Sequence, residues 1–331
     1  MTESQGRITL WGIEVFLAAA DEGSISVAAR RLGTSPSTIS QQISALELSF
    51  GVVLLDRDVR PIVMTPAGAL FHRHAQVIIN AAFEARAQLS SPTLAGLRTL
   101  RLGIIEDFDS DVTPVFLMTL AKSFPDCRFV LETGPSHRLL GKLEARAVDM
   151  VVIADMERSS EQQTWCETHE LMQEPFVLVA PKGHFPSKGA RLLDLQNLPM
   201  IQYATRHVMG RLLARHMVAQ KLNFEARFEL DNYQAILAMV AEGVGWTILT
   251  PLALQCAAQF MPAVDVLPLP FASFNRRISL SARKAFLRVI PQETAFLLRD
   301  LLQRQVVNPW CSQYHWLENQ LSILPPKVLV R

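Results

Sequence analysis

The amino-acid sequence predicts an N-terminal all-α winged helix-turn-helix, a long linker helix and a C-terminal α/β domain with two subdomains. Three observations support this fold class. Two short helix signals joined by a tight turn occupy residues 25–47. One helical apolar pattern then runs through residues 66–89. Beyond residue 98, apolar runs typical of strands alternate with amphipathic helices, which favours a mostly parallel sheet.

The helix pair carries clear start and stop signals. Ser35 is a residue type that caps helix N-termini, and Pro36 is tolerated in the first turn because its missing N–H has no partner there. We expect the first helix to begin with Ser26 as its cap and to end at Gly33. The second helix has an apolar stripe at helical spacing, formed by Ile39, Ile43 and Leu46.

The opposite face of the second helix is small and polar. Its hydroxyl and amide side chains can reach base edges or phosphate oxygens in a DNA groove. An ordinary amphipathic pair with a solvated face is the alternative, because short helix pairs are common. The expected DNA-binding residues lie on this face and on the flanking arginines: Arg30, Arg31, Ser35, Pro36, Ser37, Thr38, Gln41, Gln42, Arg57 and Arg60.

The flanking segments complete the predicted winged domain, residues 1–64. An earlier helix ends near Glu22-Gly23, and two short strands surround a charged turn from Asp56 to Pro61. Residues 65–90 form the linker helix, which Thr65-Pro66 opens. Its apolar seam suits packing against the same helix of a second subunit. Packing against its own headpiece is the alternative, and both arrangements can hold together.

Residues 8–89 resemble the winged helix-turn-helix and linker helix of LysR-type transcriptional regulators. The resemblance rests on FLAAADEGSISVAARRLGTSPSTISQQISALE, GVVLLDRDVRP and MTPAGALF, in that order. It implies a ligand-responsive regulator that binds an interrupted palindrome in double-stranded DNA as a homodimer or homotetramer. It also implies RNA polymerase as a further partner. The family often has Arg at the position of Gln41, so a direct charged contact is missing there.

The C-terminal domain, residues 91–307, shows two successive sets of strands and helices. It resembles the periplasmic-binding-protein-like effector domain of the same family, most recognisably in AEGVGWTILTP. Residues 308–331 form an aromatic-rich C-terminal extension, expected as an amphipathic helix followed by an extended strap. The strands are expected at 99–105, 127–133, 149–154, 176–181, 199–203, 227–230 and 246–250.

Ligands of open α/β folds bind beyond the carboxyl ends of strands and at helix N-termini. These positions predict the effector-binding residues Ile105, Glu106, Asp107, Phe108, Thr133, Ser136, Gln202, Tyr203, Arg206 and Asn232.

The loop 106–111 is acidic, whereas the family often places Ser or Thr there to hold a carboxylate. Because like charges repel, we hypothesise an effector with a cationic, amine or hydroxyl-rich portion near Glu106 and Asp107. The alternative is that these acids only complement a helix N-terminus and face water. Arg206 and His207 could instead bind an anion from the other subdomain.

Charge limits how the headpiece can bind DNA. Residues 1–64 contain five Arg, no Lys and seven acidic residues. Non-specific affinity comes mainly from phosphate neutralisation, so a single headpiece should bind weakly. Paired headpieces would compensate through their combined contacts.

The amino-acid composition limits which other classes of protein this chain can belong to. The chain is 49% hydrophobic and has no apolar run long enough to span a bilayer or act as a secretion signal, so a cytoplasmic protein without membrane contact is expected. Its four scattered cysteines predict reduced thiols and no metal site, with a redox-sensing pair as the alternative.

We expect no cofactor, because phosphate-binding, dinucleotide-binding and nucleophile-elbow motifs are absent. An enzyme is therefore disfavoured, and an effector-independent DNA-binding protein is the other alternative.

Overall fold

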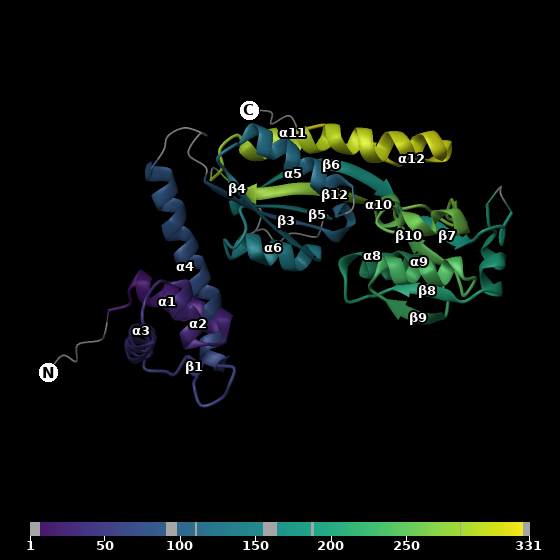
Figure 1. Cartoon of the computed structure of the whole chain (residues 1–331). Coiled ribbons are helices and arrows are strands. Elements are labelled where there is room, and N and C mark those ends of the chain that lie inside the picture. Colours follow the sequence, from purple (N-terminus) through teal and green to yellow (C-terminus); the bar gives the residue numbers. More distant parts are fainter. Residues whose placement is uncertain are drawn as a thin grey trace. The chain divides into compact units, whose positions relative to one another are not determined.

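The structure is a computed structural model that describes residues 7–90, 98–109, 111–154, 164–186, 189–284 and 286–326. The chain divides into two compact units, which we call the headpiece and the effector unit. The headpiece is built mainly on the residues before Arg98, and the effector unit on Arg98–Leu143 and the residues from Val148 onward (Figure 1). None of the described helices is both long enough and apolar enough to cross a membrane.

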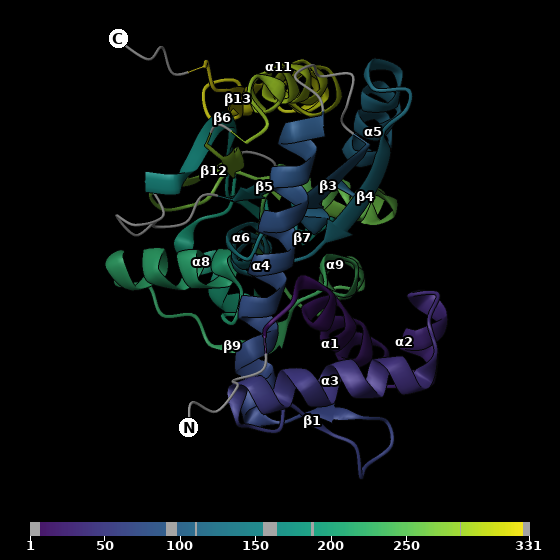
Figure 2. The same cartoon turned by 90° about the vertical axis from the view of Figure 1, so that its left-hand side faces the viewer.

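The headpiece is the predicted winged helix-turn-helix. Helix α1 packs against α2, α3 and α4 (Figure 2). The expected stripe of α3 is confirmed, because Ile39, Ile43 and Leu46 are all buried in the headpiece core. The elements are α1 (Leu10–Glu22), α2 (Ile25–Arg31), α3 (Pro36–Phe50), the antiparallel strands β1 (Leu55–Asp56) and β2 (Val63–Met64), and α4 (Pro66–Ser90).

Three of the four predicted signals in the helix pair are confirmed, and Pro36 is the first residue of α3. The Ser35 hydroxyl accepts the Thr38 N–H at 3.2 Å, and Gly33 takes the left-handed conformation at φ +65° that the turn requires. The expected cap at Ser26 is wrong. Ser24 is the N-cap of α2 and accepts the Val27 N–H at 3.4 Å. Ile25 packs against the headpiece core, which places the helix start before Ser26.

Helix α4 has two apolar faces. Ala75 and Ile79 are buried against the headpiece, whereas Leu70 and Ile78 are 52% and 40% exposed. The His72 Nε2 lies 3.2 Å from Asp21 Oδ1 and ties α4 to α1. The helix thus packs on its own headpiece, and part of its apolar surface stays exposed. The side chains at 80 and 83–90 lie outside the described residues.

The first subdomain of the effector unit is a six-stranded sheet in the order β13-β6-β12-β5-β3-β4. Helices α5 and α11 cover one face and α6 the other (Figure 1). Its strands are β3 (Thr99–Ile104), β4 (Arg128–Thr133), β5 (Met150–Ala154), β6 (Cys166–Pro175), β12 (Asn275–Arg283) and β13 (Ser322–Ile323). Its helices are α5 (Val112–Ser123), α6 (Ser136–Glu144) and α11 (Ile290–Leu302).

The second subdomain contains two small sheets, so the predicted division of the domain is confirmed. Strand β7 pairs antiparallel with β10 and β11, while β8 and β9 are parallel. The EGVG segment lies between α9 and β10, as expected for a helix–strand connection. The elements are β7 (Val177–Pro181), β8 (Met200–Tyr203), α8 (Val208–Ala219), β9 (Ala226–Leu230), α9 (Tyr233–Ala241), β10 (Thr247–Leu249), α10 (Pro251–Gln255) and β11 (Val264–Leu267).

The prediction of a mostly parallel sheet is wrong. Only β3–β4 and β3–β5 are parallel in the large sheet, whereas β12 is antiparallel to both β5 and β6. Strands β6 and β12 carry the chain between the two subdomains in opposite directions. Neither strand was predicted, because charged and polar residues interrupt their apolar positions.

The described part of the predicted C-terminal extension packs within the effector unit. Helix α11 continues through a π-helical turn, Gln303–Val307, into α12 (Asn308–Gln313). Trp310, Leu317 and Leu321 are buried, and β13 pairs with β6. The expected strap falls largely on residues 327–331, which lie outside the described residues.

Candidate functional site

Helix α3 presents the predicted polar face to solvent. Ser37, Gln41 and Ser44 are exposed, directly opposite the buried stripe. The Ser35 hydroxyl lies 2.8 Å from the hydroxyls of both Ser37 and Thr38, so the start of the helix is a compact cluster of hydrogen-bonding groups. Such a surface can approach a nucleic acid closely without a bulky apolar obstacle. Gln42, by contrast, is half-buried.

The four predicted arginine contacts fall into two groups. Arg57 folds from the wing onto α3, where its Nη1 donates to Ser44 Oγ at 3.2 Å and its Nη2 pairs with Glu47. Arg31 pairs with Glu22 at 3.0 Å. Arg30 and Arg60 are exposed and form no ion pair within the described part of the chain. These two therefore carry the cationic charge most accessible to a phosphate.

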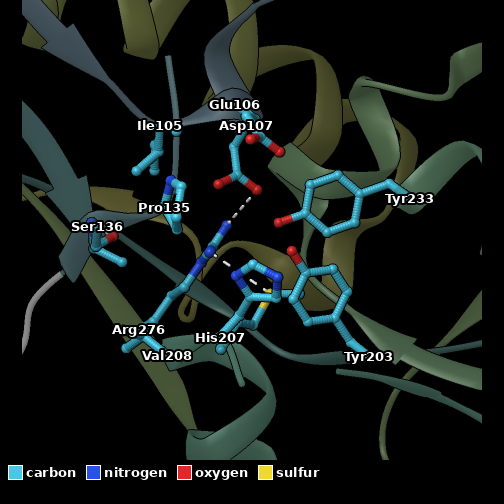
Figure 3. A pocket seen from close by; sticks show the side chains of 13 residues that line it. Ile105, Glu106, Asp107, Pro135, Ser136, Tyr203, His207, Val208, Tyr233 and Arg276 are labelled. Atoms are coloured by element: carbon cyan, nitrogen blue, oxygen red, sulfur yellow. Dashed lines mark hydrogen bonds and ion pairs between the residues drawn. The ribbon is translucent and has the colours of Figure 1, made fainter. Parts of the chain in front are cut away.

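A second site is a pocket at the junction of the two subdomains of the effector unit. The first subdomain contributes the loop after β3 and the start of α6, and the second contributes the start of α8 and Tyr233 of α9 (Figure 3). Strand β12 supplies Arg276. The lining residues are Ile105, Glu106, Asp107, Gly134, Pro135, Ser136, Ala154, Tyr203, His207, Val208, Met209, Tyr233 and Arg276.

Arg276 is the electrostatic centre of this pocket. Its Nη2 lies 3.1 Å from Asp107 Oδ1 and 2.9 Å from Thr250 Oγ1, so it reaches both subdomains. Its Nε donates to Glu174 Oε1 at 2.7 Å. Desolvation lowers the pKa of Arg276, but the negative charges of Asp107 and Glu174 outweigh it and raise the pKa overall. The guanidinium is therefore permanently charged.

The two carboxylates beside Arg276 are buried. Asp107 is 7% exposed and Glu174 is fully buried, where its Oε2 also accepts the Leu252 N–H at 3.0 Å. Burial raises the pKa of the Glu174 carboxyl, against the lowering effect of Arg276, and the Asp107 charge raises it further. Two acidic side chains thus share one guanidinium.

Two stacked tyrosines form the opposite wall. The rings of Tyr203 and Tyr233 are 5.1 Å apart and inclined by 20°. Burial raises the pKa of Tyr203 to about 12, and it also raises the pKa of Tyr233. Both side chains therefore keep neutral hydroxyls at physiological pH. Across the pocket, buried Ser136 accepts the Ala154 N–H at 3.2 Å.

The structure brings together five of the ten predicted effector residues. Ile105, Glu106, Asp107, Ser136 and Tyr203 line the pocket. The alternative in which the acids merely face water does not hold for Asp107, because Asp107 is buried and paired. Glu106 is exposed at the rim.

The other five predicted residues do not line this pocket. Phe108 is buried in the core, Thr133 is exposed and Gln202 is half-buried elsewhere. Arg206 pairs with Asp231 outside the pocket. Asn232 caps α9 by accepting the Ala235 N–H at 3.0 Å and borders a neighbouring cleft.

Sequence reasoning missed Tyr233 and Arg276. Tyr233 directly follows the helix cap Asn232, so the helix-start signal could have nominated it. No local signal could have found Arg276, which lies 169 residues from Asp107.

Family models match both parts of the chain. Residues 10–69 match the model of the bacterial regulatory helix-turn-helix proteins of the lysR family, and residues 96–303 match the LysR substrate binding domain. The chain therefore belongs to the LysR family of transcriptional regulators. At the level of the family, it is a regulator rather than an enzyme.

Curated relatives include two mycobacterial proteins, each named a probable hydrogen peroxide-inducible genes activator. The protein from Mycobacterium xenopi is 34% identical over 193 residues, which cover 58% of this chain and 98% of the relative. The protein from Mycobacterium avium is 33% identical over 215 residues, 63% of this chain and 67% of the relative.

Solved structures share the fold. A full-length OxyR variant from Pseudomonas aeruginosa aligns with a TM-score of 0.69 at 22% identity and covers 91% of this chain and 96% of that chain. Full-length CbnR in complex with its target DNA aligns with a TM-score of 0.62 at 20% identity, over 88% of this chain and 100% of that chain.

Proposed function

We propose that this protein reads double-stranded DNA with α3 and regulates transcription in response to a small molecule in the junction pocket. The exposed polar face of α3 carries the DNA-binding part of the proposal. Ser37, Gln41 and Ser44 face solvent on a helix whose other side is locked into the headpiece core. In helix-turn-helix proteins the second helix enters the major groove, and its N-terminal residues contact base edges.

A binding-site selection experiment with the full chain tests this assignment. Gln41→Ala combined with Thr38→Ala should lose discrimination between DNA sequences while the protein stays folded. Ser26→Ala is the matched control, because it removes an exposed hydroxyl from α2 instead of α3. An unchanged sequence preference in the double variant would refute the groove assignment.

We further propose that two headpieces act together on an interrupted palindrome, in a dimer or tetramer joined through α4. The face of α4 that carries Leu70 and Ile78 is exposed and apolar. The low positive charge of the headpiece also requires paired binding for useful affinity. Ile78→Glu should shift the sedimentation coefficient toward the monomer and abolish cooperative DNA binding. Retention of the wild-type assembly would place the subunit contact elsewhere.

The junction pocket is the proposed effector site, because residues from both subdomains line it. A ligand there can favour one subdomain arrangement over another. Val208→Trp should fill the pocket and remove stabilisation by any bound small molecule in a thermal-shift screen. Val218→Trp is the matched control on the same helix, since Val218 is 76% exposed. If no compound stabilises the wild-type protein, effector-independent DNA binding becomes the better account.

A response to peroxide is the second candidate, because curated relatives are named hydrogen peroxide-inducible genes activators. Among the described residues that line the junction pocket there is no cysteine. Cys256 borders the neighbouring cleft, and its thiol lies 3.2 Å from the Asp107 carbonyl oxygen. Burial raises the pKa of Cys127 and of Cys311, which disfavours the reactive thiolate at both positions. A peroxide-dependent DNA footprint that Cys256→Ser abolishes would establish this candidate.

A further inference from the structure

We propose that the junction pocket binds a small ligand through a cationic amine, held by the carboxylate of Asp107 against Tyr203 and Tyr233. The inference rests on the proposed effector function of the pocket and specifies the chemical class of the effector. It depends on which charges in the pocket are already compensated and which are available.

Arg276 has little capacity left for an anionic ligand. Its Nε is used by Glu174, and its Nη2 is shared between Asp107 and Thr250. Its Nη1 faces the Met209 sulfur at 3.6 Å. An incoming carboxylate would have to compete with two buried carboxylates for this one guanidinium. Removing either partner would leave a buried charge uncompensated, which is costly.

Asp107 keeps one acceptor for a ligand. Its Oδ1 faces Arg276 at 3.1 Å, while Oδ2 has no hydrogen-bond partner among the described residues. The side chain is buried and lines the pocket, so a ligand would meet this oxygen away from bulk water. Figure 3 shows the Asp107 carboxylate beside Arg276, with the two tyrosine rings on the other side. A hydrogen bond from a charged donor is stronger in such a place than at the surface.

The remaining charges of the pocket also favour a cation. Glu106 lines the rim, and Glu174 lies behind Arg276. Together with Asp107 these are three acidic side chains, whereas Arg276 is the one arginine among the described residues that line the pocket. His207 also lines the pocket, and its Nε2 lies 3.6 Å from Asp231 Oδ2. The acidic side chains around the pocket thus outnumber its one arginine, which favours an amine over a carboxylate.

The tyrosine pair supplies the rest of an amine site. Neutral hydroxyls can accept a hydrogen bond from an ammonium group, and aromatic faces attract cations. The stacked arrangement fixes both rings with little freedom to rotate. The pocket thus offers one charged acceptor and two neutral hydroxyl acceptors to the same ligand group, beside the stacked rings.

Calorimetric titration of the full chain with matched probes tests the inference. The probes are benzylamine, benzyl alcohol and benzoate, together with butylamine, butanol and butyrate. We expect the amines to bind and the alcohols and carboxylates to bind at least about tenfold more weakly, as for a lost hydrogen bond to a charged group. Asp107→Asn should weaken amine binding by about tenfold to a hundredfold.

Asp109→Asn is the control, because it removes a charge from the same loop at a residue that borders the neighbouring cleft and not this pocket. It should leave amine affinity within about twofold of wild type. Tyr233→Phe keeps the buried ion network and should weaken amine binding without changing the DNA footprint.

Preferential binding of the carboxylates, equal binding of all three classes, or no binding by the amines would each overturn the inference. An unchanged DNA footprint in those cases would show that the DNA-binding proposal survives. Loss of sequence-specific DNA binding by the wild-type chain would instead count against the proposed function itself.

Discussion

Arg276 and Glu174 lie opposite each other in the antiparallel pair of β12 and β6, and the Arg276 Nε–H donates to Glu174 Oε1 at 2.7 Å. These two strands are the ones that pass between the subdomains. Because Arg276 also contacts Asp107 in the first subdomain and Thr250 in the second, one guanidinium joins the hinge strands to both walls of the pocket.

Arg276→Leu should destabilise the effector unit strongly. The variant would leave Asp107 and Glu174 buried without their shared cation, which costs about 3–5 kcal/mol. Arg277→Ala provides the neighbouring control, because Arg277 is 55% exposed and its pair with Glu170 should contribute about 0–1 kcal/mol. Urea unfolding of both full-length variants measures the difference. Similar losses for the two would mean that the buried network does not stabilise the fold.

Tyrosine ionisation should be suppressed in the folded protein. The chain has three tyrosines, and burial raises the pKa of Tyr203, Tyr233 and Tyr314 above the ordinary value of 10. The folded state therefore holds these protons when the unfolded state releases them. Stability should fall as the pH rises from 10 through the folded pKa of Tyr203, about 12.

Ultraviolet absorbance at alkaline pH checks this expectation. The native chain should show little tyrosinate at pH 10, whereas the chain in urea should show about half of its full signal. Equal signals in the two states would contradict the burial of the tyrosine pair.

Gly68→Ala should disturb the packing of α4 on the headpiece. A Cβ at Gly68 would lie 1.9 Å from the Leu54 carbonyl oxygen, so the backbone would have to move. Overpacking of this kind costs about 1–3 kcal/mol or more. Gly141→Ala in α6 meets nothing within 4 Å and should stabilise its helix by about 0.5–1 kcal/mol. Thermal unfolding of the two variants should therefore shift in opposite directions.

Ser35→Ala should weaken α3 through its cap. The lost hydrogen bond to the Thr38 N–H costs about 1 kcal/mol, typical of an N-cap serine. The same change at Ser26, which does not cap α2, should cost less than about 0.5 kcal/mol. Circular dichroism melting distinguishes the two. A larger loss of stability in the Ser26→Ala variant would indicate that Ser26 caps α2, as the sequence suggested.

The headpiece could be predicted closely because its signals are local. Ser35, Pro36 and Gly33 each act within one helical turn, and the buried stripe of α3 follows from spacing alone. The single error, at Ser26, arose because two serines stand two residues apart and only the packing of Ile25 selects between them.

The junction pocket could be predicted only in part. Positions at the ends of predicted strands nominated Asp107, Ser136 and Tyr203, and all three line the pocket. Arg276 lies on a strand that the alternation pattern does not reveal, and its partners are 102 and 169 residues away in the chain. The ion pair of Arg276 with Glu174 forms because β12 and β6 are neighbours in the sheet, and the residue pattern within one strand does not show which distant strand lies beside it.

Strand β13 has a protective role in the large sheet. Ser322 and Ile323 pair with Gln173 and Met172 on the outer side of β6. An uncovered edge strand offers its backbone groups to any other extended chain and invites aggregation. Because β13 pairs with two residues of β6, it covers that part of the edge and leaves a very short strand outermost, which limits the backbone groups open to pairing with another chain.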